Sequence, residues 1–556
     1  MLVALHNRTQ FSIQSAFSHI DDLVDRALEL GIEALAITDK HTLSGCVEFY
    51  KTVKEKSKGK IKPILGCDLY ISETEYITVL CQNRTGWDNL IKLVNKTDWT
   101  QKQPYINASE IKDEMLKDLI IITQIGGDKV GNHNSVGGYN LNDMKYSLYP
   151  NPDDRLYLQI ILASKHKCTS NELLEKFPEY KEIFDGDSQH HLIGNSGQDY
   201  DQIVASISDY DISNKPKIPT SGIDKPDEYL MQLCRDGWKD KLLNKLKDDS
   251  KLKEVYTNRI KTELEVIKQA KLANYFLVIR EIMHHSRSSG YPCGLRGSAS
   301  GCLISYLIDI SDIDPILPDP TLPYDPNKEL SFQRFYSDAR NTDNNISLPD
   351  IDGDFPISFR EELIEFIKDK YGHDCVSNII TFGRMDGRGA IKEVFRVLNP
   401  VPNSFEMANV ITDHMVDTAK VQDELEELKE DNPKYNVINY CIDTIPIVKE
   451  YYDQFKNEFD IAIRLANTIR NEGKHAAGIV ISPDPLDNWF PCKTDPKTNQ
   501  KVLALEMEDA EYVGAVKYDI LGVAAYEKIY KIIDMINNNL LEPVVGLTEG
   551  IVNDDT

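Results

Sequence analysis

Three aspartates occupy alternate positions in the stretch Pro349-Asp-Ile-Asp-Gly-Asp-Phe355. Alternate side chains of a β-strand point to the same face, so this spacing would bring Asp350, Asp352 and Asp354 together. Three neighbouring carboxylates repel one another unless cations lie among them. The pattern therefore favours a Mg²⁺ site that serves phosphoryl transfer.

Two other interpretations compete with a magnesium site. A calcium loop would use Asp350 as its first ligand and Glu361 at the twelfth position, but Phe355 stands at the sixth position, which requires glycine. A solvated acidic turn would need no ion at all. The triplet alone leaves this second alternative open.

A glycine- and serine-rich stretch, Gly294-Leu-Arg-Gly-Ser-Ala-Ser-Gly301, precedes the apolar run from Cys302 to Ile308. Such a loop opening into a helix exposes backbone N–H groups at the positive end of the helix dipole, which suits phosphate. Arg296 would add a fixed cation. The loop could equally serve close packing, and it is not a Walker A motif because no Gly-Lys-Ser/Thr follows.

The N-terminal part alternates between short apolar runs and amphipathic stretches. Strands are expected at 3–6, 34–37 and 62–68, with helices at 20–28 and 43–54 between them. This alternation predicts parallel strands with crossover helices. The strand ends carry His6, Asp39 and Asp68, which either form a site or serve as turn and cap residues.

Composition limits the class of protein. The 556 residues suggest roughly three to four domains, and 41% hydrophobic with 27% charged residues excludes collagen, long coiled coils and full disorder. There is no apolar run long enough to span a membrane and no secretory-signal pattern at the N-terminus. Ten cysteines without a CxxC pair indicate a reducing cytoplasm, which would be the host cytoplasm for a viral protein. The net charge of −26 argues against a protein that coats nucleic acid, although a local basic channel remains compatible with it.

Nearly the whole chain resembles the C-family replicative DNA polymerases, the bacterial DNA polymerase III alpha subunits. Several motifs in one order are more specific than any one of them. In chain order they are Asn274-Tyr-Phe-Leu277, Gly294–Gly301, Asp312-Ile-Asp-Pro315, Phe332-Gln-Arg-Phe335, Leu348–Phe355, Ile379-Ile-Thr-Phe-Gly383, Arg388–Val397, Gly473-Lys-His-Ala-Ala-Gly478 and Val516-Lys-Tyr-Asp-Ile-Leu-Gly522.

The N-terminal part resembles the polymerase-and-histidinol-phosphatase (PHP) domain in Leu5–Thr9, Ala36–Asp39 and Pro63–Asp68. Active PHP domains hold metals with a His-x-His pair, an Asp-His pair and a downstream Asp-x-His. Here Arg8 and Lys40 stand where two histidines are expected, and Gly222 and Asp224 match the downstream pair. A cation repels metals and cannot replace imidazole as a ligand. The degraded site is therefore expected to bind no metal, with Arg8 or Lys40 paired to a carboxylate; its residues are His6, Arg8, Asp39, Lys40 and Asp68.

The polymerase resemblance implies catalysis by two Mg²⁺ ions, for which Mn²⁺ could substitute. Their ligands would be two aspartates of the triplet, either Asp350 with Asp352 or Asp352 with Asp354, together with Asp519. The incoming dNTP would be bound by Arg296, Gly297, Ser298 and Arg340. Further DNA or phosphate contacts are expected at Arg388, Lys474, His475 and Lys517. For the cations Arg296, Arg340, Arg388 and Lys517 the alternative is a structural ion pair, and for His475 it is a structural histidine at a helix start.

The resemblance also implies an α/β multidomain fold. A PHP-type distorted (β/α) barrel is expected over 1–225, and an α+β, nucleotidyltransferase-like palm over 226–390 and 471–530. A helical thumb would be inserted at 391–470. Residues 531–556 would begin the fingers region or form a tail.

The function implied is that of a DNA-directed DNA polymerase acting on primer-template DNA and dNTPs. No segment matches the fingers, the clamp-binding part or the OB-fold, so either a second polypeptide supplies them or the chain is a truncated form. Of these, a split polymerase or an unusual, phage-encoded member is expected. A sliding clamp or a proofreading exonuclease could join through that complex. The alternatives are a non-catalytic replisome scaffold and a PHP-type phosphoesterase.

Overall fold

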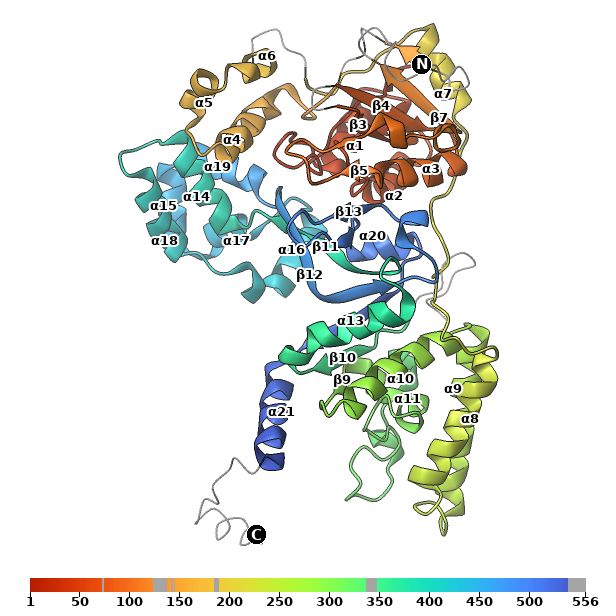
Figure 1. The fold of residues 1–556 in the computed structure, drawn as a ribbon. Helices are drawn as coiled ribbons and strands as arrows, with labels where there is room; N and C mark the ends of the chain where they lie inside the picture. The colour runs from red at the N-terminus through yellow and green to blue at the C-terminus, as the bar shows by residue number, and fades with distance from the viewer. Residues whose placement is uncertain are drawn as a thin grey trace. The chain divides into compact units, whose positions relative to one another are not determined.

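The computed structural model describes residues 1–72, 75–123, 138–141, 144, 146–184, 190–336 and 348–538. The chain forms two compact units that alternate along the sequence (Figure 1). The first unit comprises Met1–Ile212, Ile380–Lys474 and Asp487–Asp509, and the second comprises Ser213–Ile379, His475–Leu486 and Ala510–Thr556. Among the described residues, no helix is both long and apolar enough to cross a membrane.

The first unit begins with a six-stranded sheet in the order β1-β2-β3-β4-β7-β8, which curls into a half barrel. Its strands are β1 (Val3–Ala4), β2 (Ala34–Ile37), β3 (Lys62–Tyr70), β4 (Tyr76–Cys81), β7 (Leu119–Thr123) and β8 (Gly138–Asn140). β1, β2 and β3 are parallel, whereas β4 pairs antiparallel with both β3 and β7. A separate two-stranded sheet joins β5 (Thr97–Asp98) to β6 (Tyr105–Ile106).

Seven helices belong to the described residues of the same part of the chain, and the first two of them match the helices predicted at 20–28 and 43–54. They are α1 (Ile20–Glu29), α2 (Cys46–Ser57), α3 (Arg84–Val94), α4 (Arg155–Lys165), α5 (Ser170–Lys176), α6 (Lys181–Phe184) and α7 (Gln198–Ser206). The strands expected at 34–37 and 62–68 are present as β2 and β3. All four residues of β2 are fully buried, as expected for a parallel strand with both faces covered.

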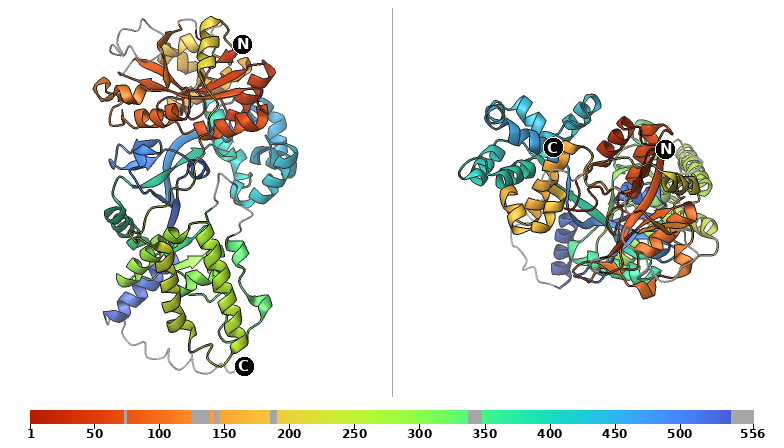
Figure 2. Two further views of the ribbon diagram at one scale, coloured as in Figure 1. Left: turned by 90° about the vertical axis from the view of Figure 1, so that its right-hand side faces the viewer. Right: turned by 90° about the horizontal axis from the view of Figure 1, so that it is seen from above.

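A group of short helices forms the rest of the core of the first unit. It contains α14 (Gly387–Leu398), α15 (Ser404–Asp413), α16 (Gln422–Asp431), α17 (Val437–Thr444), α18 (Pro446–Gln454) and α19 (Lys456–Leu465). α14 packs against α15, α19 and α4 (Figure 2). Phe395 and Phe455 meet edge to face with ring centroids 5.2 Å apart inside this core. The helical character expected for 391–470 is therefore present, and its role as a thumb remains a prediction.

The second sheet has seven strands in the order β13-β14-β11-β12-β15-β10-β9. Their bounds are β9 (Gly294–Arg296), β10 (Asp352–Phe355), β11 (Val376–Arg384), β12 (Ile469–Ile481), β13 (Cys492–Thr494), β14 (Lys501–Leu503) and β15 (Lys517–Gly522). β10 runs parallel to β15 and antiparallel to β9. β11 and β12 each contribute residues to both units.

The second unit contains most of the remaining helices. They are α8 (Pro226–Gly237), α9 (Ser250–Gln269), α10 (Ala273–Ser288), α11 (Leu303–Leu307), α12 (Phe332–Phe335), α13 (Arg360–Tyr371) and α21 (Ala524–Asn537), and α20 (Met507–Tyr512) lies at the division between the units. Of these, α13 contacts β15 and α21 contacts β10. α10 is buried over most of its length, as predicted for the apolar run after Asn274. α21 lies at the edge of the unit, with Ile529, Ile532 and Ile536 exposed (Figures 1 and 2).

Candidate active site

Three carboxylates converge between β10 and β15. Each of Asp350, Asp352 and Asp519 places one carboxylate oxygen within 4.8 Å of the others. Asp352 and Asp519 are register partners on the two parallel strands. Asp350 lies before the start of β10, so the prediction that Asp350, Asp352 and Asp354 share one strand is wrong. The cluster instead draws on β10, on β15 and on the segment that precedes β10.

A lysine contacts this cluster from the same strand as Asp519. The Nζ atom of Lys517 lies 2.8 Å from Oδ2 of Asp519 and 3.8 Å from Oδ1 of Asp350. Residues 517 and 519 share a face because side chains alternate along β15. One cation among three carboxylates leaves an excess of negative charge.

The electrostatics of the cluster fit a divalent cation. Partial burial, a hydrogen bond with Asp519 and the negative charge of Asp350 raise the pKa of Asp352 to about 6. Oδ1 of Asp519 is buried and has no hydrogen-bond partner among the described residues. Carboxylate oxygens that repel one another, with one lacking any donor, make a suitable ligand set for Mg²⁺ or Mn²⁺.

Asp354, the third aspartate of the triplet, has a different partner. Arg296 Nε donates to Oδ1 and Oδ2 of Asp354 at 2.8 and 3.1 Å, and Arg296 Nη2 donates to Oδ1 at 2.6 Å. Of the two pairings expected from the sequence, the structure thus groups Asp350 with Asp352.

Two residues that sequence reasoning left without a role support the cluster. The hydroxyl of Tyr275 donates to the carbonyl oxygen of Pro349 at 2.7 Å and so fixes the backbone before Asp350. Burial and the nearby carboxylates raise the pKa of Tyr275 well above its ordinary value. Gly478 is the register partner of Asp519, and a Cβ atom there would lie 3.4 Å from Oδ1 of Asp519. Both residues could have been identified from the sequence, because each lies in a motif of the family resemblance.

The glycine-rich stretch does not expose a helix N-terminus. Gly297–Gly301 forms a 3-10 turn, and α11 after it has five residues. The N–H of Ile304 donates to Oε2 of the fully buried Glu263 at 3.0 Å. The prediction of free N–H groups at the start of this helix is therefore wrong, because a carboxylate from α9 occupies that place. Arg296, Gly297 and Ser298 themselves are exposed.

The remaining predicted cations have local partners. Arg388 donates to the carbonyl oxygen of Met415. Lys474 Nζ lies 2.6 Å from Oδ2 of Asp495. His475 lies on β12 and not at a helix start as expected, and its Nδ1 accepts from the N–H of Gly478 at 2.6 Å. Arg340 lies outside the described residues.

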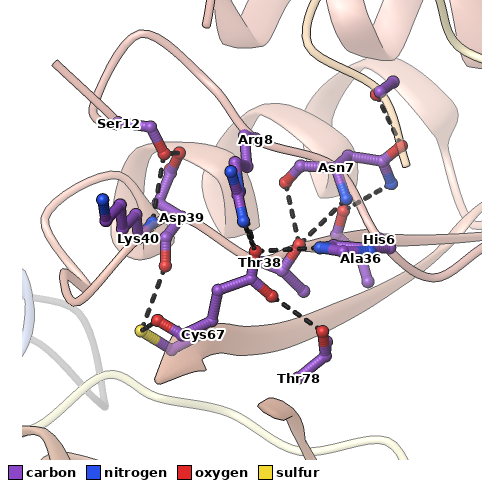
Figure 3. Close-up of polar contacts among 12 residues, drawn as sticks. His6, Asn7, Arg8, Ser12, Ala36, Thr38, Asp39, Lys40, Cys67 and Thr78 are labelled. Carbon is purple, nitrogen blue, oxygen red and sulfur yellow. Dashed lines mark hydrogen bonds and ion pairs between the residues drawn. The ribbon is translucent and has the colours of Figure 1, made fainter. Parts of the chain in front are cut away.

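Within the degraded PHP site, His6 and Arg8 form ion pairs with the buried Asp68 (Figure 3). His6 Nε2 and Arg8 Nε lie 2.8 and 2.7 Å from Oδ2 of Asp68, and Thr78 Oγ1 donates to Oδ1 at 2.7 Å. Burial opposes ionisation of Asp68, but the charges of His6 and Arg8 outweigh it and lower the pKa of Asp68. Of the pairings left open by the sequence, the structure shows Arg8 with Asp68.

Asp39 and Lys40 are not paired with each other. Asp39 accepts hydrogen bonds from the N–H and hydroxyl of Thr9 and from the hydroxyl of Ser12, each at 2.6 Å. Burial raises the pKa of Asp39 despite these donors. Lys40 Nζ donates to Oε1 of Gln103 at 3.1 Å, and burial together with the charge of Arg8 lowers its pKa to about 8.

The loop that follows Arg8 reaches the second sheet within the first unit. Gln10 Oε1 accepts from the N–H of Ile469 at the start of β12, at 3.1 Å. The rings of Phe11 and Phe382 meet edge to face at 5.1 Å. The N-terminal domain therefore packs directly on the outer ends of β11 and β12.

Comparisons with known proteins agree with this arrangement. The profile described as "Bacterial DNA polymerase III alpha NTPase domain" matches residues 228–522, and that of the PHP domain matches residues 4–136. DNA polymerase III subunit alpha of Ureaplasma parvum serovar 3 is 29% identical over 559 residues, covering 97% of this chain and 52% of that protein. The Escherichia coli K12 protein of the same name is 28% identical over 607 residues, covering 96% of this chain and 49% of that protein.

The chain thus spans about half the length of the curated relatives it matches. Among solved structures, a putative metal-dependent phosphoesterase from Bifidobacterium adolescentis is 15% identical, with a TM-score of 0.15, covering 36% of this chain and 62% of that one. The polymerase profile covers more than half of the sequence and includes the whole carboxylate cluster, so this chain belongs to the family of the bacterial DNA polymerase III alpha NTPase domain, preceded by a PHP domain.

Proposed function

We propose that this chain carries the catalytic carboxylates of a DNA-directed DNA polymerase, which transfers nucleotides from dNTPs to a primer 3′-hydroxyl as the template directs. The observation that carries the proposal is the cluster of Asp350, Asp352 and Asp519, which lies inside the region matched by the family profile. The names of the relatives support the same reaction.

The chain's own residues have separate parts in this proposal. Asp350, Asp352 and Asp519 would hold two Mg²⁺ ions, or Mn²⁺ in their place. When bound, such ions activate a hydroxyl nucleophile and stabilise the negative charge of a leaving pyrophosphate. Lys517 orients Asp519 through its 2.8 Å contact and offsets part of the carboxylate repulsion. The exposed Arg296, Gly297 and Ser298, with Arg340, would bind the triphosphate.

We further propose that regions corresponding to the unmatched half of the relatives, among them the fingers and the clamp-binding part, complete the nucleotide pocket, whether they belong to a second polypeptide or to a longer form of this one. A sliding clamp or a proofreading exonuclease would join through that complex. All ten cysteines are free thiols, which suits a cytoplasmic location.

The N-terminal domain has a structural function in this proposal. Arg8 occupies the carboxylate of Asp68 that a metal would otherwise use, which argues against a PHP-type phosphoesterase. The contacts of Gln10 and Phe11 support β11 and β12 instead. Among the three functions expected from the sequence, a scaffold without catalysis gains no support, because clustered carboxylates with a buried unpaired oxygen serve no packing purpose.

Primer extension tests the proposal. The purified chain is assayed with primed template, Mg²⁺ and four dNTPs, alone and with an extract of its source. Activity that needs the extract and is lost in Asp352→Asn, but not in Asp236→Asn at an exposed ion pair of α8, supports a split polymerase. Activity of the chain alone would contradict the need for a second polypeptide. Activity that survives both Asp352→Asn and Asp519→Asn would contradict the catalytic assignment.

A further inference from the structure

We propose that Asp354 is a positioning residue, which holds Arg296 toward the nucleotide's phosphates and away from the carboxylate cluster. This inference rests on the proposed function, because it assigns a role to a neighbour of the same cluster. It goes further in that Asp354 would not be a metal ligand, although its spacing suggests one.

The contact between the two side chains is bidentate and charge-assisted. Both oxygens of Asp354 accept hydrogen bonds from Arg296, at 2.6 to 3.1 Å. The side chain of Asp354 is 11% exposed, whereas that of Arg296 is 48% exposed. A largely buried carboxylate thus anchors an arginine whose side chain is still about half exposed to solvent, as a phosphate-binding arginine requires.

The strand register makes this choice of partner informative. On the antiparallel strands β9 and β10, Arg296 lies directly opposite Asp352, while Asp354 lies opposite Gly294. Directly opposite side chains are closer than diagonal ones, so Asp352 is the nearer carboxylate by position. Arg296 nevertheless bonds the diagonal Asp354. The carboxylate of Asp352 thereby remains in the cluster without a bound guanidinium, which would compete with a metal ion for its oxygens.

Tyr526 of α21 covers the strand position beside Asp354. A Cβ atom at Gly294 would lie 1.9 Å from the hydroxyl oxygen of Tyr526, so this hydroxyl covers the strand position opposite Asp354. Burial and the charge of Asp354 raise the pKa of Tyr526. Exclusion of water strengthens an ion pair, so this cover helps to keep Arg296 on Asp354.

Binding of Mn²⁺ alone, measured by calorimetry on the full chain, tests the inference without requiring activity. In Asp354→Asn, Arg296 loses its anchor and can turn to Asp352, so we expect Mn²⁺ affinity to fall about fivefold. Adding Arg296→Gln removes the competing cation, and the double variant should return to within about twofold of wild type. Asp352→Asn should lose Mn²⁺ affinity whether or not Arg296 is present, and Asp236→Asn is the control.

Two results would overturn the inference. If Asp354 were itself a ligand, the double variant would bind Mn²⁺ as weakly as Asp354→Asn. Unchanged Mn²⁺ affinity in Asp354→Asn would show that Arg296 does not compete for Asp352. Failure of Asp352→Asn to weaken Mn²⁺ binding would instead contradict the proposed function, so the two failures are distinguishable.

Extension kinetics give a second readout. Asp354→Asn and Arg296→Gln should each raise the KM for dNTP about tenfold, and Asp354→Glu should recover part of the loss. A loss confined to kcat in Asp354→Asn, with KM unchanged, would contradict a role that acts through Arg296.

Discussion

Asp352 and Asp519 are register partners on the parallel strands β10 and β15, and a hydrogen bond joins their side chains. Their hydrogen bond requires a proton, and burial together with the neighbouring charges raises the pKa of Asp352 to about 6. Near neutral pH the metal-free cluster therefore carries negative charge that destabilises the folded protein.

Replacing one of these carboxylates should stabilise the metal-free protein. We expect Asp352→Asn to raise the free energy of unfolding by about 1 kcal/mol at pH 7.5 without metal, a modest effect because solvent screens the cluster. Mg²⁺ should raise the melting temperature of the wild type and leave that of the variant nearly unchanged. Thermal unfolding with EDTA and with Mg²⁺ measures both effects. If Mg²⁺ raised the melting temperatures of the wild type and of Asp352→Asn equally, it would bind at a site other than this cluster.

Arg8 should contribute more to stability than Lys40. Arg8→Ala leaves the fully buried Asp68 without its permanent cation and should cost about 3 kcal/mol. Lys40→Ala removes a cation whose described hydrogen bond goes to the neutral Gln103, so its cost should be about 1 kcal/mol. Urea unfolding of both variants provides the comparison. In Arg8→Ala/Asp68→Asn the loss should be partly recovered, and equal costs for the two single variants would contradict the pairing.

The N-terminal domain should contain no metal. Asp352→Asn and Asp519→Asn in the full chain remove the carboxylate cluster between β10 and β15 as a source of bound ions. Elemental analysis of this protein after dialysis should find less than one tenth of a zinc or manganese ion per chain. Stoichiometric metal that disappears on His6→Ala would show that the degraded site still binds an ion.

Gly478 should tolerate no side chain. A Cβ atom there would lie 3.1 Å from Nδ1 of His475, which is closer than an ordinary contact, so Gly478→Ala must shift the imidazole ring beside Asp519. We expect a roughly tenfold loss of extension rate. Gly473→Ala on the same strand is the matched control, since its Cβ would meet Thr381 at an ordinary 3.4 Å. Equal rates for the two variants would show that the space beside Asp519 is not needed.

The buried His41 and the partly buried His19 predict loss of stability in acid. Burial lowers the pKa of His19 to about 4 and that of His41 to about 3. Both values lie below the ordinary 6.5, so the unfolded chain takes up protons first as the pH falls. Their contribution is complete above about pH 6.5 and is lost as the pH falls toward 4.

Variants isolate this effect from that of the carboxylates. His41→Gln keeps an acceptor for the N–H of Tyr70, which Nε2 of His41 binds at 3.0 Å. The stability lost between pH 6.5 and 4.5 should shrink by an amount on the order of 2 kcal/mol in this variant. The exposed His373→Gln is the control. An unchanged pH profile in His41→Gln would show that His41 is protonated in the folded state.

The sequence predicts which segments form strands and helices better than it predicts which side chains bond to one another. β2, β3 and α10 lie where the apolar spacing placed them, because burial dictates that spacing directly. Alternation could not show that Arg296 withdraws Asp354 from the triplet, since this depends on which strand lies beside β10. Likewise, Glu263 reaches the start of α11 from a separate helix, and no local pattern encodes such a contact.

The pairing of Arg8 with Asp68 has a consequence for how this protein depends on its surroundings. A domain built around bound metal can fold only as far as the supply of that metal allows, and it competes for it with every other metalloprotein. Here the positive charge that neutralises the buried Asp68 belongs to Arg8, so every molecule carries it from synthesis onward. We therefore expect the domain that supports β11 and β12 to fold independently of the metal supply, whereas a scarcity of ions would act on the cluster of Asp350, Asp352 and Asp519.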